Sequence, residues 1–214
     1  MFNEYLKEND VVLYIHGKDG SIEEAEHYKT IFPSCNVFGF EYKSFTPWET
    51  GKEIREEIST LKTSYDRIIL IANSVGVFFS MNAGIDEDID HAYFISPIVN
   101  MEKLIMDMMS YAGVTESELQ EKGRIQTDLG EELSWEYLSY VRKNPIKWKT
   151  ETDILYGSKD NMTSVETVMN FAKLYNADLT VMEGGEHWFH TEEQMQYLDD
   201  WIIKKENQWR KNDS

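Results

Sequence analysis

The sequence is short of cysteine and contains no long hydrophobic run. Its 214 residues include one cysteine, Cys35, which cannot form an internal disulfide and whose place at the start of an apolar run predicts a core residue instead of a reactive thiol. No apolar run approaches the ~20 residues needed to span a bilayer, so no membrane insertion is expected. Residues 1–10 lack a basic start and an apolar stretch before a cleavage site, so we expect no secretory signal and a cytoplasmic location.

Basic residues are also scarce, with 21 Lys and Arg against 39 Asp and Glu, which gives a formal net charge of -18. Such a charge repels nucleic acid and anionic membrane surfaces, so neither is an expected partner. It also disfavours polyanionic substrates such as nucleotides and coenzyme A thioesters. The sequence has no internal repeat or heptad run, and it makes no prediction of oligomeric state.

What is present is the composition of a globular protein, with 41% hydrophobic and 13% aromatic residues, and a length that predicts one domain over residues 1–214. The expected strands are residues 11–17, 35–42, 67–72, 92–97, 152–160 and 178–185, and the expected helices are residues 21–31, 46–61, 75–83, 163–175 and 191–205. This alternation predicts an α/β fold, a three-layer α/β/α sandwich around a six-stranded parallel sheet.

The alternation is interrupted between residues 98 and 150, which we interpret as one insertion within the domain. Its patterns predict a Met-rich helix at 101–112, a short capped helix from Thr115, a polar turn at 128–130 and an aromatic helix at 133–142.

The most informative stretch is RIILIANSVGVFF, residues 67–79, where a strand meets a helix at the turn Ala72-Asn73-Ser74-Val75-Gly76. Ala72 and Gly76 are small, as a sharp strand-to-helix turn requires, because bulky side chains there would collide with the adjoining strand and helix. Such a turn lifts the serine hydroxyl above the sheet beside the first free amides of the helix. Alone, a five-residue pattern of this kind also occurs by chance in ordinary turns.

Polar residues that suit catalysis follow several of the expected strands. In a parallel sheet, ligands bind beyond the carboxyl ends of the strands. Ser74 follows the third strand, Asp160 the fifth and His187 the sixth. A serine needs a base to become a nucleophile, and the base needs an orienting carboxylate. The order Ser, Asp, His therefore predicts a nucleophile, an acid and a base.

With these residues, the chain resembles the α/β-hydrolase family. The matching motifs are HG at 16–17, ANSVG at the turn, LYGSKD at 155–160 and GGEHWF at 184–189. The resemblance covers nearly the whole chain, starting at what would be the third strand of the larger family sheet, and Ala72 stands where the family usually has glycine. It implies a minimal member in which the insertion is a mostly helical lid.

The resemblance also implies roles for individual residues. Ser74 would attack a carbonyl carbon, His187 would carry the proton and Asp160 would orient the imidazole. The backbone amides of Val75 and Lys18 would bind the oxyanion.

The insertion supplies the expected substrate pocket. Met108, Met109 and Trp135, together with Trp188 beside the histidine, are candidates for an apolar wall that takes an aliphatic or aromatic acyl group. The alternative is that these Met and aromatic residues simply pack the insertion onto the body.

The remaining histidines and acids are expected to be structural. His16 would brace its loop, and His27 and His91 would be solvated or capping. His190 and Glu186 suggest a metal pair, but no HExxH or Cys/His cluster completes a ligand set, so we expect neither a metal nor a cofactor. Two rival acids are less well placed than Asp160, since Asp153 begins its strand and Asp128 lies in the insertion.

The leading functional hypothesis is a serine hydrolase that cleaves small-molecule carboxylic esters with an apolar or aromatic acyl group through an acyl-enzyme. The same residues would serve a thioesterase or an amidase. A binding protein that kept the fold without catalysis is a second class, and a lyase or carbon–carbon hydrolase is a third.

Overall fold

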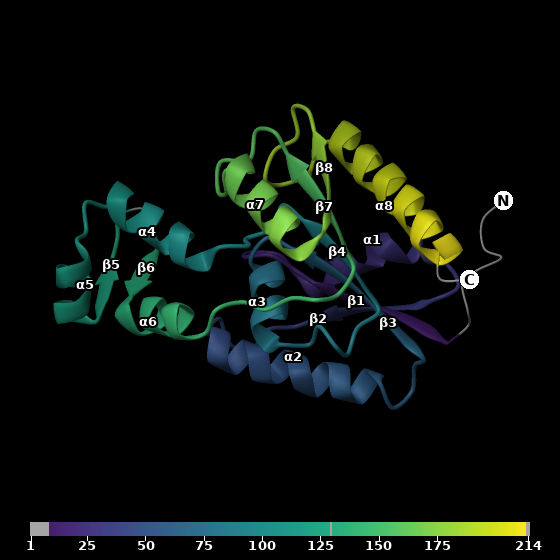
Figure 1. Ribbon diagram of the computed structural model, residues 1–214, viewed down its shortest axis with the longest axis horizontal. Helices are drawn as coiled ribbons and strands as arrows, with labels where there is room; N and C mark the ends of the chain where they lie inside the picture. The colour runs from purple at the N-terminus through teal and green to yellow at the C-terminus, as the bar shows by residue number, and fades with distance from the viewer. Residues whose placement is uncertain (1–8, 129, 213–214) are drawn as a thin grey trace.

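A six-stranded parallel sheet forms the centre of the computed structural model, which describes residues 9–128 and 130–212 (Figure 1). The strand order is β2-β1-β3-β4-β7-β8, and every neighbouring pair is parallel. The strands are β1 (Asp10–Ile15), β2 (Asn36–Phe40), β3 (Arg67–Asn73), β4 (His91–Ile95), β7 (Thr152–Gly157) and β8 (Asp178–Met182). The predicted α/β class and all six strands are confirmed. Residues 1–8, on which the absence of a signal was argued, lie outside the described residues.

Helices cover both faces of the sheet, as parallel strands require. The 3₁₀ turn η1 (Ile22–Glu24), α1 (Ala25–Lys29) and α8 (Glu192–Asn212) belong to one outer layer, and α2 (Pro47–Leu61), α3 (Val75–Ala83) and α7 (Val165–Tyr175) form the other. In the described parts of the chain, no helix combines the length and apolar character that crossing a bilayer demands.

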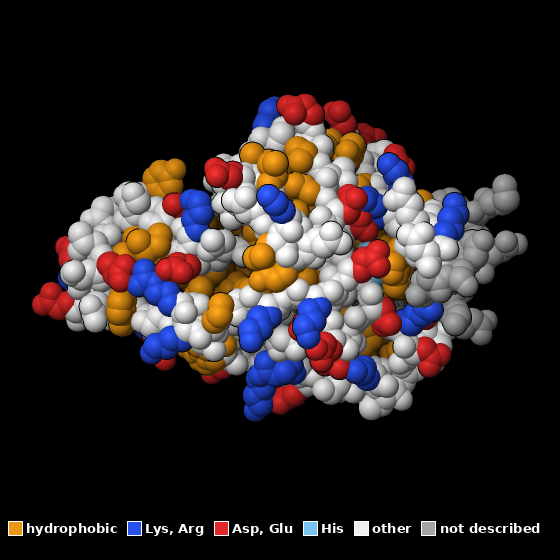
Figure 2. Space-filling view, in the orientation of Figure 1, with side chains coloured by type: hydrophobic (Ala, Val, Ile, Leu, Met, Phe, Trp, Pro, Cys, Tyr) orange, Lys and Arg blue, Asp and Glu red, His pale blue; other side chains and the backbone are white. Residues whose placement is uncertain are grey.

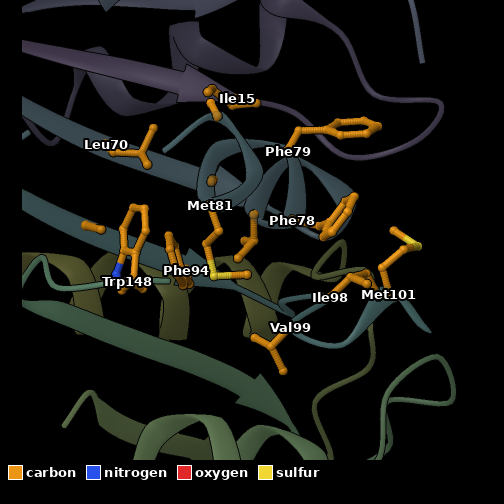
Figure 3. Close-up of a cluster of buried hydrophobic side chains, with 14 of the residues drawn as sticks. Ile15, Leu70, Phe78, Phe79, Met81, Phe94, Ile98, Val99, Met101 and Trp148 are labelled. Carbon is orange, nitrogen blue, oxygen red and sulfur yellow. The ribbon is translucent and has the colours of Figure 1, made fainter. Parts of the chain in front are cut away.

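Alternation along the strands divides the core into two clusters. On β3, Leu70 and Ala72 pack toward α2, α3 and α7, whereas Ile69 and Ile71 pack toward α1 and α8. Figure 3 shows the first cluster, in which Phe78, Phe79 and other side chains of α3 contact residues of the sheet. Trp148, from the segment that leads from the insertion back to the sheet, belongs to the same cluster. Burial of both faces fixes the register of β3, because a shift by one residue would exchange the two sets of side chains. The position of Ser74 at its end is fixed with it.

The insertion forms a separate lobe at the left of Figure 1, between β4 and β7. It contains α4 (Met101–Tyr111), α5 (Glu116–Lys122), β5 (Arg124–Gln126), β6 (Glu132–Ser134) and α6 (Trp135–Lys143). The three helices were predicted, but the antiparallel β5–β6 pair was not. Each of these strands has only three residues, mostly polar, so it carries no apolar alternation. The predicted turn at 128–130 includes Leu129, which lies outside the described residues.

Three predicted helix boundaries were wrong. The first helix divides into η1 and the short α1, which ends at Lys29. The cap of α7 is Ser164, whose hydroxyl accepts a hydrogen bond from the Thr167 amide, and not Thr163. The last helix continues to Asn212 instead of ending near 205, because Arg210 reaches back to the carboxylate of Asp10 at the start of β1.

The only cysteine, predicted to be a core residue, lies at the edge of a core cluster. Cys35 is half-buried and packs against the cluster beneath α1 and α8. Burial raises the pKa of its thiol to about 12. The neutral thiol is therefore the dominant form at physiological pH, and a thiolate nucleophile is disfavoured.

Candidate active site

The turn between β3 and α3 holds Ser74 in a conformation that few residues adopt. Its φ is 51° and its ψ is -118°, outside the regions favoured by residues with a Cβ atom. The strain is held by backbone hydrogen bonds on both sides: the Ser74 amide donates to the carbonyl of Ile95 (3.0 Å), and the Ser74 carbonyl accepts from the amide of Ile98 (3.1 Å). Strained backbone of this kind persists only where the surroundings over-determine it, and it is concentrated at functional sites.

Two glycines let the turn approach the loop after β1. A Cβ atom on Gly76 would lie 2.5 Å from the carbonyl oxygen of Ile15, and one on Gly17 would lie 2.7 Å from Oδ1 of Asn73. Both distances are shorter than van der Waals contact. The predicted steric role of Gly76 therefore has a specific cause, which is the closeness of α3 to the end of β1.

Ser74, His187 and Asp160 form a continuous hydrogen-bonded series. Oγ of Ser74 lies 2.8 Å from Nε2 of His187, and Nδ1 of His187 lies 2.6 Å from Oδ2 of Asp160. Oδ1 of Asp160 accepts hydrogen bonds from the amides of Met162 (2.8 Å) and Thr163 (3.1 Å). A carboxylate can only accept, so Nδ1 carries the proton and Nε2 is left to accept from the serine hydroxyl.

The three side chains of this series differ in solvent exposure. The Asp160 side chain is 0% exposed and that of His187 is 18% exposed, while Ser74 is half-buried. The carboxylate is thus shielded from water, and the hydroxyl remains open to an incoming molecule. This arrangement can activate a serine for attack on a carbonyl carbon.

A contact that the sequence did not reveal joins the loops of Asp160 and His187. A Cβ atom on Gly157 would lie 2.5 Å from the backbone of Gly185, and the Lys159 amide donates to the Gly185 carbonyl (2.8 Å). The Gly184 amide also donates to the hydroxyl of Ser158 (2.8 Å). These contacts fix the distance between acid and base. The only sequence signal was the glycines themselves, in LYGSKD and GGEHWF.

The residues predicted to bind an oxyanion flank Ser74. Val75 is the first residue of α3, where amide N–H groups have no acceptor within the helix. Lys18 follows Gly17 in the loop that touches the serine turn. Its side chain forms an ion pair with Glu131 of the insertion, which connects this loop to the inserted lobe.

The loop after β1 is braced from within the body. Nδ1 of His16 lies 2.7 Å from the Gly17 carbonyl, which agrees with the structural role expected of this histidine. The Tyr42 hydroxyl donates to the His16 carbonyl (2.7 Å), a contact that the sequence did not predict. Burial raises the pKa of Tyr42 well above its ordinary value, so its hydroxyl remains a donor at physiological pH.

The four predicted pocket residues lie in different surroundings. Met108 and Trp135 are half-buried against the core cluster, and Met109 is 2% exposed, which leaves it to packing within the insertion. Trp188 is 71% exposed, and its ring stacks on that of His190 at 4.6 Å. Trp188 is therefore presented to solvent next to His187.

His27, expected to be solvated or capping, is partly exposed and its Nε2 lies 2.6 Å from Oδ1 of Asp199 in α8. The prediction for His91 was wrong, since it is 0% exposed and its Nε2 lies 3.0 Å from Oδ2 of Asp153. Asp153 is thus at the opposite end of the sheet from Ser74. Asp128 is exposed on the insertion.

His190 and Glu186 approach each other but complete no ligand set. Nδ1 of His190 lies 3.6 Å from Oε2 of Glu186. Residues 9–128 and 130–212 contain no group of three or more His, Cys, Asp or Glu side chains able to hold a metal ion.

A groove of about 560 Å³ separates the base of the insertion from α7. Figure 2 shows hydrophobic side chains in the hollow between the two. Phe78, Val99, Met101 and Phe171 line it together with polar residues such as Asn100 and Asn170. Ser74, Asp160 and His187 are not among its lining residues. The hydrogen-bonded series therefore forms no part of the wall of this groove.

The sequence matches no protein-family profile and no curated protein. The structure is similar to Est1E from Butyrivibrio proteoclasticus, with a TM-score of 0.73, 16% identity, and coverage of 94% of this chain and 88% of that one. The chain has the α/β-hydrolase fold. Mouse alpha/beta hydrolase domain-containing protein 10 is similar at a TM-score of 0.73, with 15% identity and coverage of 92% and 90%. A structure of Est1E with bound ferulic acid has a TM-score of 0.72, with 15% identity and coverage of 96% and 92%.

Proposed function

We propose that this α/β-hydrolase-fold protein is a serine hydrolase that cleaves carboxylic esters through an acyl-enzyme. The observation that carries the proposal is the series Ser74–His187–Asp160, whose two links measure 2.8 and 2.6 Å. Its order along the chain and its place at the carboxyl ends of β3, β7 and β8 support the same assignment.

The proposed reaction has two halves. Oγ of Ser74 attacks the ester carbonyl carbon while Nε2 of His187 takes the hydroxyl proton, and the amides of Val75 and Lys18 donate to the oxyanion. The tetrahedral intermediate expels the alcohol oxygen, which receives the proton from His187, and the acyl group stays on Ser74. Water then attacks the acyl carbon by the reverse sequence, with His187 as base, and releases the acid and free Ser74.

An apolar or aromatic acyl group is the proposed substrate feature. Trp188 offers an exposed ring beside His187, and Trp135 and Met108 are partly buried apolar side chains of the insertion. Est1E, which shares the fold, has been seen with ferulic acid, an aromatic acid. The -18 net charge favours uncharged esters over polyanionic ones.

The test combines labelling and turnover. A fluorophosphonate should modify Ser74, as mass mapping of the labelled peptide would show, and Ser74→Ala should lose both labelling and hydrolysis of p-nitrophenyl esters. Ser59→Ala, which removes an exposed hydroxyl on α2, is the matched control and should keep both. Label on another residue, or unchanged turnover by Ser74→Ala, would contradict the proposal.

The alternatives are separated by substrates that share one acyl group. Comparing kcat/KM for an aryl ester, its thioester and its anilide would distinguish an esterase from a thioesterase or an amidase. Product analysis would identify a lyase or carbon–carbon hydrolase, and a binding protein would leave Ser74 unlabelled. We further propose a cytoplasmic location, which the single unpaired Cys35 supports.

A further inference from the structure

Ser96, the first residue after β4, combines two unfavourable features. Its φ is 45°, in the left-handed region that residues with a Cβ atom seldom adopt. Its side chain is 0% exposed, and its hydroxyl has no hydrogen-bond partner within the described parts of the chain. Buried polar groups are nearly always paired, and an unpaired one calls for a reason. A strained backbone is a second pointer to function at the same residue.

The position of Ser96 is set by strands on both sides. β4 lies between β3, which ends at Ser74, and β7, which leads to Asp160. The carbonyl of Ile95 accepts from the amide of Ser74 (3.0 Å), and the amide of Ser96 donates to the carbonyl of Leu155 in β7 (2.9 Å). Ser96 therefore occupies the gap between nucleophile and acid, which the imidazole of His187 spans.

The ring of His187 has one edge that suits this gap. Its two nitrogens are engaged by Ser74 and Asp160. The Cε1–H group lies between those nitrogens, on the side of the ring away from the bond to the main chain. It consequently lies between the contacts to Ser74 and Asp160, at the edge of the ring opposite the His187 backbone. C–H groups of this kind donate weak hydrogen bonds to oxygen, which strengthen when the ring is charged.

We propose that Ser96 is a positioning residue whose hydroxyl oxygen faces the Cε1–H edge of His187 and stabilises the imidazolium formed when Ser74 gives up its proton. This inference rests on the proposed function. The hydroxyl has no conventional partner at rest and gains its interaction as charge develops on the ring. An interaction that is stronger in the transition state than in the ground state raises kcat without lowering KM.

The decisive variant is Ser96→Ala. We expect kcat to fall about two- to fivefold with KM unchanged, the size expected for one weak C–H···O contact. In the plot of kcat/KM against pH, the fall on the acid side (the acid limb) should move about half a pH unit lower, because the ring loses a group that favours its charged form. The melting temperature should hold or rise, since an unpaired buried hydroxyl has been removed. Asp160, which binds the ring, and the charged or titratable residues of the adjoining loops, Lys18, Lys159, Glu186 and His190, are the same in both proteins.

Two further variants separate the hydroxyl from the backbone. Ser96→Gly relieves the left-handed strain and also lacks the hydroxyl, so it should show the same loss of kcat as Ser96→Ala. Recovery of kcat in Ser96→Gly would instead assign the effect to strain and overturn the inference. Asn176→Gly is the matched control, because Asn176 is a left-handed residue (φ 54°) at the end of α7. Removing the backbone strain there should leave kcat and the acid limb unchanged.

A spectroscopic measurement tests Ser96 independently of turnover. The Cε1 proton resonance of His187 should move upfield in Ser96→Ala, because a C–H···O contact has been lost. An unmoved resonance, or a higher melting temperature with unchanged kcat and acid limb, would show that Ser96 is merely structural. Wild-type protein that neither hydrolyses esters nor reacts with a fluorophosphonate would contradict the proposed function, and the resonance would still decide the contact.

Discussion

Two His–Asp pairs lie at opposite ends of the parallel sheet, and each takes its aspartate from β7 or from the loop that follows it. At the carboxyl end, His187 and Asp160 are 2.6 Å apart, and at the amino end, His91 of β4 and Asp153 of β7 are 3.0 Å apart. The residue types and the hydrogen bond are alike. Only the first pair has a serine hydroxyl at the second ring nitrogen.

The surroundings of His91 explain why it carries no chemistry. Its ring lies between those of Tyr93 (4.7 Å) and Trp209 (4.8 Å), it is 0% exposed, and its Nδ1 meets no partner among residues 9–128 and 130–212. Lys205 also binds Asp153 at 2.7 Å. The catalytic role proposed for His187 and Asp160 therefore depends on a ring nitrogen that meets a serine hydroxyl at an accessible edge of the sheet. In the closed core, the pair of His91 and Asp153 stabilises the fold.

The largest expected effect comes from breaking the pair at the carboxyl end. Asp160→Asn should lower kcat for ester hydrolysis by about 10⁴-fold, because the amide no longer holds the imidazole in the productive tautomer. Steady-state kinetics on p-nitrophenyl esters would measure this. Far-UV circular dichroism should be unchanged, and a variant that keeps more than a tenth of wild-type kcat would show that Asp160 has no such role.

Breaking the other pair should reverse the pattern. Asp153→Asn should leave kcat unchanged and lower the free energy of unfolding by about 2–4 kcal/mol, because it uncouples His91 and Lys205 from a buried carboxylate. Urea unfolding measures the loss. If Asp153→Asn were as stable as the wild type, or if its kcat fell with unchanged stability, the two ends of the sheet would not differ in the way proposed.

The loss in Asp153→Asn should depend on pH. Burial raises the pKa of Asp153, but the hydrogen bonds and charges of His91 and Lys205 outweigh it, so the net pKa is lowered. The stabilisation is thus complete above the unfolded value of about 3.9 and disappears as the pH falls through the lower folded value. Urea unfolding from pH 7 to pH 3 should show the two proteins converging toward the acid end. A constant difference would contradict this.

The smallest effect concerns an exposed ion pair. Lys18 and Glu131 join the loop beside Ser74 to the insertion, with side chains 52% and 42% exposed. Exposed pairs contribute about 0–1 kcal/mol, so Glu131→Gln should change KM for bulky esters by less than about fivefold, and not at all in 1 M salt, where screening is complete. A large effect that persists in high salt would show that the contact is not merely electrostatic.

The sequence predicted the six strands and the convergence of Ser74, Asp160 and His187, because each of these residues directly follows a strand and parallel strands share one edge. It could not predict contacts between residues far apart in the chain. The length of α8 depends on Arg210 meeting Asp10, and the burial of His91 depends on Trp209 in that added length.

Local ambiguity accounts for the other errors. Thr163 and Ser164 are both suitable caps, and Ser164 takes the role because the backbone of Thr163 is engaged by Asp160 and Tyr156. The β5–β6 pair was missed because three-residue polar strands resemble turns. Ser96 was missed because neither its left-handed backbone nor its unpaired hydroxyl can be predicted from the sequence around it.

The ion pair between Asp10 and Arg210 also bears on how the chain can be reconnected. It places the start of the first strand beside the end of the last helix, 200 residues later, on the side of the sheet remote from Ser74. A short peptide could join those two positions without crossing the sheet, and new ends could be opened in the exposed turn after α2. Such a circular permutant should assemble the same sheet, since no described strand or helix would be cut.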